Sequence, residues 1–302
     1  MAIVLTRSLP SSIVLIRLRS ALNKMPPRSV CTNSDIDALA SAHARFRSLG
    51  EGSVLLEKNK MTGIATITLQ HQEKKNALSG QMMVQLADAV SELESWQEGR
   101  GLIFRAVGDF FCSGGDLTVV QKISNNADGD LMCRLMQDTT TRLHRLPLVS
   151  VCLVHGRAIG GGAELTTATD FRLFTEAGRV QFVQGFMGVS TGWGGGTRLA
   201  RLLGARKALD WLLTARPIHA SEALDCGFAD NIVQQDAVYD EAHQWLQERL
   251  KFHPDVIRAF KKTVTGACDN DVEQSLLNER KLFSPLWGGP ENLRMLQKGT
   301  KH

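Results

Sequence analysis

The chain reads Gly156-Arg-Ala-Ile-Gly-Gly-Gly-Ala-Glu-Leu165 where a predicted strand, residues 148–154, gives way to a predicted helix. The strand is a nearly continuous apolar run, which is typical of a strand buried on both faces of a sheet. Peptide N–H groups at a helix N-terminus lack intrahelical partners and carry partial positive charge, so they can hold an oxygen that becomes anionic. We therefore expect this turn to present main-chain N–H groups to a ligand.

A second glycine segment, Phe110-Phe-Cys-Ser-Gly-Gly-Asp-Leu117, follows the predicted strand 102–106. Two adjacent glycines allow backbone angles that other residues avoid and let a ligand approach the main chain closely. Taken alone, this segment is equally well interpreted as an ordinary tight turn. Together the two segments could supply the paired N–H groups of an oxyanion hole.

The pattern around these segments indicates an α/β fold, because strands and helices alternate along the chain. A β-branched run at 64–69 and a short run at 171–174 add two strands, and Ser79 is placed to cap a helix. A further helix is predicted around 131–146, and from about residue 197 the signals are mostly helical. We expect an N-terminal extension over 1–52, poorly ordered at its start, an α/β core over 53–228 and a helical region over 229–302.

Composition excludes several classes of protein. The 302 residues are 43% hydrophobic and 22% charged, and no apolar stretch is long enough for a membrane span. The net charge is only +4, which gives little reason to expect nucleic acid as a partner. The six cysteines are scattered without a C-x-x-C pair, so we expect no disulfide framework, no metal site and a reducing compartment.

Residues 1–34 carry basic residues and serines but no acid, as mitochondrial presequences do. An unstructured tail has the same composition. Both interpretations stay open at this point.

Other glycine motifs fail on the residues present. The chain has neither G-x-G-x-x-G nor G-x-x-x-x-G-K-[ST], which excludes the dinucleotide and P-loop patterns. Gly188-Val-Ser-Thr-Gly192 matches the G-x-S-x-G nucleophile elbow, but glycines break the sequence on both sides where a strand and a helix are required. A serine hydrolase is therefore disfavoured.

Taken in chain order, these segments resemble the crotonase (enoyl-CoA hydratase/isomerase) superfamily over roughly residues 53–290. The resemblance implies an α/β spiral of strand-strand-helix units with a helical C-terminal trimerisation region. It also implies acyl-CoA substrates and homotrimers or hexamers. Since coenzyme A is part of such a substrate, no separate cofactor is expected.

The resemblance also assigns residues. It implies that Gly115 and Gly161 supply the two N–H groups of the oxyanion hole, and that Lys75-Asn-Ala-Leu-Ser79 holds the adenine side of coenzyme A. Lys281-Leu-Phe283 resembles the segment that reaches coenzyme A on a neighbouring subunit. The substrate-binding residues implied by these three motifs are Lys75, Ala77, Ser113, Gly114, Asp116, Leu117 and Phe283.

Glu164 is the candidate catalytic acid, because a carboxyl beside an oxyanion hole can move a proton at the carbon next to the carbonyl. As a plainer alternative it is a first-turn acid favoured by the helix dipole. Hydratases of the resembled superfamily use a second glutamate, whose place would fall near Gln184. An amide cannot exchange a proton as a carboxyl does, which argues against efficient hydration.

The missing acid fits decarboxylation of a malonyl-type thioester, and the chain most resembles the decarboxylase branch, whose substrates include ethylmalonyl-CoA and methylmalonyl-CoA. We expect an apolar pocket for the departing carboxylate, and a protonated Glu164 beside it that delivers its proton to the enolate. The candidate lining residues are Phe182, Phe186, Met187 and Trp193.

Three alternatives stay open. They are an enoyl-CoA hydratase or isomerase that uses Glu164 alone, an acyl-CoA hydrolase, and an inactive scaffold that binds RNA or another partner. The decarboxylase branch favours the cytosol, whereas the N-terminal composition favours the mitochondrial matrix.

Overall fold

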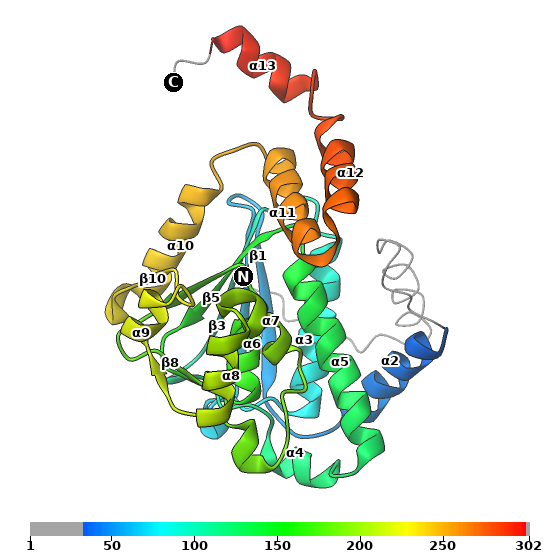
Figure 1. Cartoon of the computed structure of the whole chain (residues 1–302), viewed down its shortest axis with the longest axis vertical. Coiled ribbons are helices and arrows are strands. Elements are labelled where there is room, and N and C mark those ends of the chain that lie inside the picture. Colours follow the sequence, from blue (N-terminus) through cyan, green and yellow to red (C-terminus); the bar gives the residue numbers. More distant parts are fainter. Residues whose placement is uncertain (1–32, 300–302) are drawn as a thin grey trace.

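The computed structural model describes residues 33–299 (Figure 1). The predicted targeting sequence (residues 1–34) and the predicted poorly ordered start of the N-terminal extension fall almost entirely on residues 1–32. These residues lie outside the described range. Within the described range, no helix is both long and apolar enough to span a membrane.

The larger sheet has six strands in the order β1-β2-β3-β5-β7-β10. β1 pairs antiparallel with β2, and each later pair in this sheet is parallel. Four of these strands confirm the sequence prediction, and β5 is buried on both faces over most of its length. The bounds are Ser53–Asn59 (β1), Ile64–Gln70 (β2), Gly101–Ala106 (β3), Val149–Val154 (β5), Phe171–Phe174 (β7) and Asn231–Ile232 (β10).

The smaller sheet has the order β4-β6-β8-β9, and it positions both glycine segments. β4 (Phe110–Cys112) pairs in parallel with β6 (Arg157–Ile159), and Cys112 lies opposite Ala158. Each strand runs directly into a glycine turn, so the two turns leave the sheet side by side. β8 (Arg179–Gln181) and β9 (Ile218–His219) complete the sheet.

Three successive turns of the chain, which contain β3-β4, β5-β6 and β7-β8, each contribute a strand to the larger sheet, then a strand to the smaller sheet, and then continue into helix, which confirms the predicted spiral. Ser79 caps α3 as predicted, because its Oγ accepts a hydrogen bond from the Met82 N–H. The predicted helix at 131–146 is longer and starts at Asn126. The helices of this part are Asn33–Phe46 (α2), Gly80–Glu94 (α3), Leu117–Lys122 (α4), Asn126–Arg145 (α5), Gly161–Thr166 (α6), Gly195–Leu203 (α7), Ala205–Thr214 (α8) and Ala220–Asp225 (α9).

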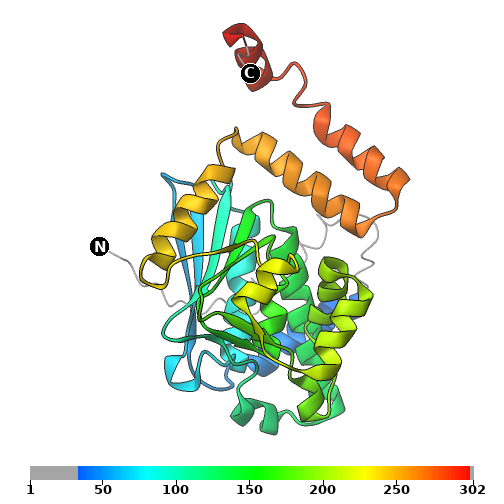
Figure 2. The same ribbon diagram turned by 60° about the vertical axis from the view of Figure 1, so that its left-hand side comes forward.

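The C-terminal region consists of α10 (Val238–Arg249), α11 (Pro254–Asp269), α12 (Val272–Phe283) and α13 (Pro290–Lys298). α10 covers the larger sheet, where Val238, Ala242 and Leu246 pack in one cluster with residues of β3 and β5. α12 and α13 form an arm that extends away from the body, as Figure 2 shows. Neither helix of this arm buries a residue, and several large apolar side chains are exposed: Val272, Leu276, Leu277, Phe283, Leu293, Met295 and Leu296.

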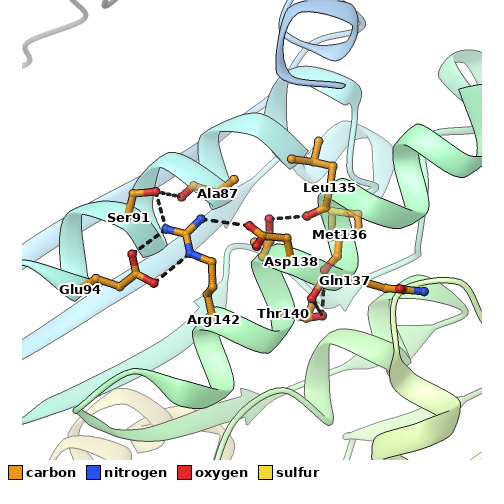
Figure 3. A network of polar contacts seen from close by, with 10 residues as sticks. Ala87, Ser91, Glu94, Leu135, Met136, Gln137, Asp138, Thr140 and Arg142 are labelled. Atoms are coloured by element: carbon orange, nitrogen blue, oxygen red, sulfur yellow. Dashed lines mark hydrogen bonds and ion pairs between the residues drawn. The ribbon is translucent and has the colours of Figure 1, made fainter. Parts of the chain in front are cut away.

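A buried ionic network fastens α3 to α5 (Figure 3). The Arg142 side chain on α5 is only 4% exposed, and its guanidinium donates to both carboxylate oxygens of Glu94 on α3, at 2.8 and 2.7 Å. It also donates to Ser91 Oγ at 2.6 Å and to Asp138 at 3.1 Å. The network therefore holds in place the helix that carries Gln137 and Thr140.

Arg142→Met is expected to lower the free energy of unfolding by about 3 kcal/mol, because two carboxylates lose the cation that compensates their burial. Urea denaturation measures the change. The matched control is Arg134→Met on the same helix, whose side chain is 44% exposed and pairs with Asp35 and Asp130. Such exposed pairs contribute up to about 1 kcal/mol. Equal losses in the two variants would show that burial of the network is unimportant.

Candidate active site

The two glycine turns meet at one point of the structure. Gly114 has a φ of +99°, and a Cβ added there would lie 3.1 Å from Ile159 O and 3.3 Å from Gly161 N. The first turn therefore passes directly against the start of α6, and only glycine fits at position 114 without strain.

Both turns contain N–H groups that are not used within the fold. Leu78 N donates to Gly114 O at 2.7 Å and Asp116 N donates to Leu78 O at 2.9 Å, which holds the first turn from both sides. The N–H of Gly115 between them, and that of Gly161 at the start of α6, donate to no acceptor among residues 33–299. Such unused donors at a helix start are suited to an oxygen that gains negative charge.

Trp193 packs directly on the second turn. It is 5% exposed, and a Cβ added to Gly161 would lie 2.6 Å from Cη2 of its indole ring. Trp193, one of the four apolar candidates for the carboxylate pocket, thus lies beside the second turn at Gly161. Phe182 is enclosed in the core, whereas Phe186 and Met187 on the 3-10 turn η2 (Gln184–Met187) are 75% and 59% exposed.

The segment 75–79 runs alongside the first glycine turn. Ser113 N donates to Lys75 O at 3.0 Å, and Leu78 forms a parallel bridge with Gly115. Lys75 and Asn76 both have left-handed φ angles, 55° and 54°. The Asn76 amide donates to the carbonyls of Val107 and Phe110, which stabilises that turn.

Three other implied binding residues lie in different settings. Asp116 is buried and caps α4; burial opposes its charge, but hydrogen bonds from Lys74 and Thr118 hold its pKa below the ordinary value. Leu117 is 60% exposed at the start of α4. Phe283 belongs to the arm, where its ring contacts Trp287, and the structure does not place it near segment 75–79.

Glu164 lies at the centre of a cage of N–H donors. It is 2% exposed, and its Oε2 accepts from the backbone N–H groups of Trp193 at 2.9 Å and Gly195 at 2.8 Å. Its Oε1 accepts from Gln184 Nε2 at 2.9 Å and from Gly192 N at 3.3 Å. Burial raises the pKa of Glu164, and these four donors oppose the rise. Four hydrogen-bond donors match a Glu164 carboxylate, which only accepts, in the ligand-free chain. That Glu164 is protonated when substrate is bound stays a prediction.

The residues that hold this cage were missed by the sequence analysis. Gln137 donates to Gly192 O at 2.9 Å, while Thr140 and Arg198 both donate to Trp193 O, at 3.0 and 2.8 Å. Gln137 and Thr140 are three residues apart on α5, a spacing that indicates a shared helix face. Nothing in the sequence indicates that this face meets the loop 192–195.

The nucleophile-elbow motif lacks its required setting. Ser190 is exposed, follows η2 and Gly188 rather than a strand, and precedes a loop rather than a helix. Residues 33–299 also contain no cluster of His, Cys, Asp and Glu that could hold a metal ion.

Comparison with known protein families identifies the fold. The enoyl-CoA hydratase/isomerase family model matches residues 59–289. The chain belongs to this family. An enoyl-CoA hydratase from Bacillus anthracis of known structure shares the fold with a TM-score of 0.76 and 24% identity, covering 81% of this chain and 94% of the other.

Relatives within the family are more similar in sequence. The chain is 46% identical over 253 residues to the ethylmalonyl-CoA decarboxylase of Xenopus tropicalis, which covers 83% of this chain and 84% of that protein. It is 44% identical over 253 residues to the ethylmalonyl-CoA decarboxylase of Homo sapiens, covering 83% of this chain and 82% of the other. The family resemblance predicted from the glycine segments is thereby confirmed.

The burial of the Glu164 carboxyl predicts that the stability of the chain depends on pH. Because burial raises its pKa in the folded chain above the ordinary 4.5, the folded state binds more protons between those two values. We expect the free energy of unfolding, relative to Glu164→Gln, to be highest in acid and to fall as pH rises through the folded pKa. Urea denaturation between about pH 4 and about pH 8 measures this difference. A difference that grows with pH would show that the four donors outweigh burial.

Proposed function

We propose that the chain is a decarboxylase that converts ethylmalonyl-CoA to butyryl-CoA and CO₂, and that also accepts methylmalonyl-CoA. The observation that carries the proposal is the contact between Glu164 and Gln184: the buried carboxyl beside the free N–H groups has an amide as its neighbour. Concerted water addition needs a second acid at that place. The decarboxylase relatives, identical at 42–46% of aligned positions, support the same reaction.

In the proposed reaction the thioester oxygen accepts hydrogen bonds from the N–H groups of Gly115 and Gly161. The bond between the α-carbon and the carboxylate breaks, its electron pair passes into the enolate, and CO₂ leaves. Glu164 then donates a proton to the α-carbon and regains one from solvent. The overall reaction consumes one proton and needs no separate cofactor.

The substrate is proposed to lie across the two glycine turns, with coenzyme A beside segment 75–79 and the acyl group toward Trp193. Lys75 is exposed there, so its ammonium is available to the coenzyme A phosphates. Phe182 can support this site only through packing, since it is enclosed.

We also propose that the chain forms homotrimers or paired trimers. The apolar side chains of the arm are exposed in the single chain, and a surface of this kind is typical of an interface. In such an assembly the arm could bring Phe283 to a neighbouring copy. Light scattering of the full chain tests the assembly state.

The cytosol is the proposed location. The basic, acid-free residues 1–34 favour the mitochondrial matrix instead. Imaging a C-terminal fusion with and without residues 1–34 separates the two.

Side-by-side incubation with ethylmalonyl-, methylmalonyl- and crotonyl-CoA tests the function. We expect CO₂ and the decarboxylated thioester from the first two, and no hydration of the third. Hydroxybutyryl-CoA from crotonyl-CoA would indicate a hydratase, and free coenzyme A a hydrolase. No turnover together with tight, salt-sensitive RNA binding would indicate a scaffold.

A further inference from the structure

Gln184 has one half of its side-chain amide satisfied and the other half without a partner. Its Nε2 donates to Glu164 Oε1 at 2.9 Å, whereas its Oε1 is buried and has no hydrogen-bond partner among the described residues. Buried acceptors are rarely left in this state, so an unpartnered one next to a candidate catalytic carboxyl indicates that a second arrangement is available.

The two oxygens of Glu164 are not equivalent. Oε2 is held at 2.9 and 2.8 Å by two backbone N–H groups, which can act only as donors. Oε1 has a long bond of 3.3 Å from Gly192 N and the bond from Gln184. A side-chain amide carries both a donor and an acceptor, and a rotation about its terminal bond exchanges them. Oε1 is therefore the oxygen at which a proton can be accommodated.

We propose that Gln184 is a positioning residue that serves both protonation states of Glu164. Its NH₂ donates to the carboxylate, and after a half-turn of the amide its carbonyl accepts the O–H of the carboxylic acid. The consequence for catalysis rests on the proposed function: Oε1 takes a proton from solvent, is held in place by the rotated amide, and gives the proton to the enolate carbon. An aliphatic side chain at 184 would serve neither state.

Among the described residues, the ionisable groups on the elements packed around Glu164 cannot play this part. Arg198 on α7 faces it; burial lowers the pKa of Arg198 to about 10, so it stays a cation and can only donate. Cys133 on α5 faces it too, and burial together with Glu164 raises the pKa of this thiol, which keeps it neutral. Cys112 at the end of β4 is also neutral, because burial raises the pKa of its thiol to about 12. Arg157 of β6 is exposed and lies over the Phe110 ring.

Infrared difference spectroscopy of the ligand-free full chain tests the proposal. The carboxylic C=O stretch of Glu164 is followed through a pH titration, and Glu164→Gln identifies the band. In Gln184→Met we expect the stretch of the protonated form to move to higher frequency, because its O–H loses the acceptor. We expect the midpoint of the Glu164 titration to move by less than about half a pH unit. The carboxylate and the carboxylic acid each lose one hydrogen bond in this variant, so neither form is favoured.

A donor that served only the carboxylate would behave differently. Its loss would raise the midpoint by about one pH unit or more and leave the acid stretch unmoved. That result, or the absence of any Glu164 titration in the wild type, would overturn the proposal. Gln137→Met is the matched control, since it loosens the same loop at Gly192 without touching Glu164, and should leave the acid stretch unchanged. Because no substrate is present, the result is independent of the decarboxylase assay.

Discussion

Glu164→Gln is expected to lower kcat for ethylmalonyl-CoA by about 10²- to 10⁴-fold, the usual contribution of a positioned acid. The amide cannot give a proton to the enolate carbon. It also replaces one acceptor oxygen by an NH₂ in a site that is lined by N–H donors in the ligand-free chain. Steady-state decarboxylation, followed as released CO₂, measures the loss.

Glu176→Gln is the matched control, because Glu176 lies exposed outside the site. It should leave kcat unchanged. Circular dichroism of both variants separates a chemical loss from a misfolded chain. Unchanged turnover in a folded Glu164→Gln protein would remove Glu164 from the reaction and leave protonation of the enolate to solvent.

Gly161→Ala is expected to lower kcat by about 10²- to 10³-fold, as the loss of one oxyanion-hole donor does elsewhere. The added Cβ would lie 2.6 Å from Trp193 Cη2, so the turn or the indole must move. Either movement displaces the N–H of Gly161 from its place beside the first turn. The kinetic loss should fall mainly on kcat, because the N–H acts on charge that develops during reaction.

Gly129→Ala provides the control on α5, where an added Cβ meets nothing within 4 Å. This change should be neutral or stabilise the fold by up to about 1 kcal/mol, since alanine is the better helix former. If Gly161→Ala kept full kcat, the N–H of Gly161 would have no part in holding the enolate.

The long elements of the fold could be predicted from the sequence because each carries its own pattern. β5 is a nearly continuous apolar run, and α3 has Ser79 at its cap and apolar residues at helical spacing. β4 and β6 are three residues each, too short for any period to be recognised. Yet their parallel pairing is what brings the two glycine turns together. That the two glycine turns lie together was predicted by the resemblance to a family and not by the periodicity of the sequence.

The site was predictable in part. Glu164 follows the glycines at a helix start, and that local pattern was sufficient to single it out. Its hydrogen-bond partners lie 20 to 31 residues further along the chain, from Gln184 on η2, through the irregular loop that follows it, to Gly195 at the start of α7. The contacts of Arg198 and Thr140 with Trp193 O depend on tertiary packing. No local pattern distinguishes Trp193, which lies at the site, from Phe186, which faces solvent.

Decarboxylation of ethylmalonyl-CoA in D₂O, with the product analysed by mass spectrometry, tests whether the chain forms an enolate by loss of CO₂ and protonates it. An enolate that is held by the two glycine turns and protonated from an exchangeable group takes up one solvent deuteron. We expect butyryl-CoA with a single deuterium at the α-carbon and one CO₂ for each thioester consumed. Recovery of intact ethylmalonyl-CoA, or of ethylmalonate with free coenzyme A, would contradict the proposed decarboxylation.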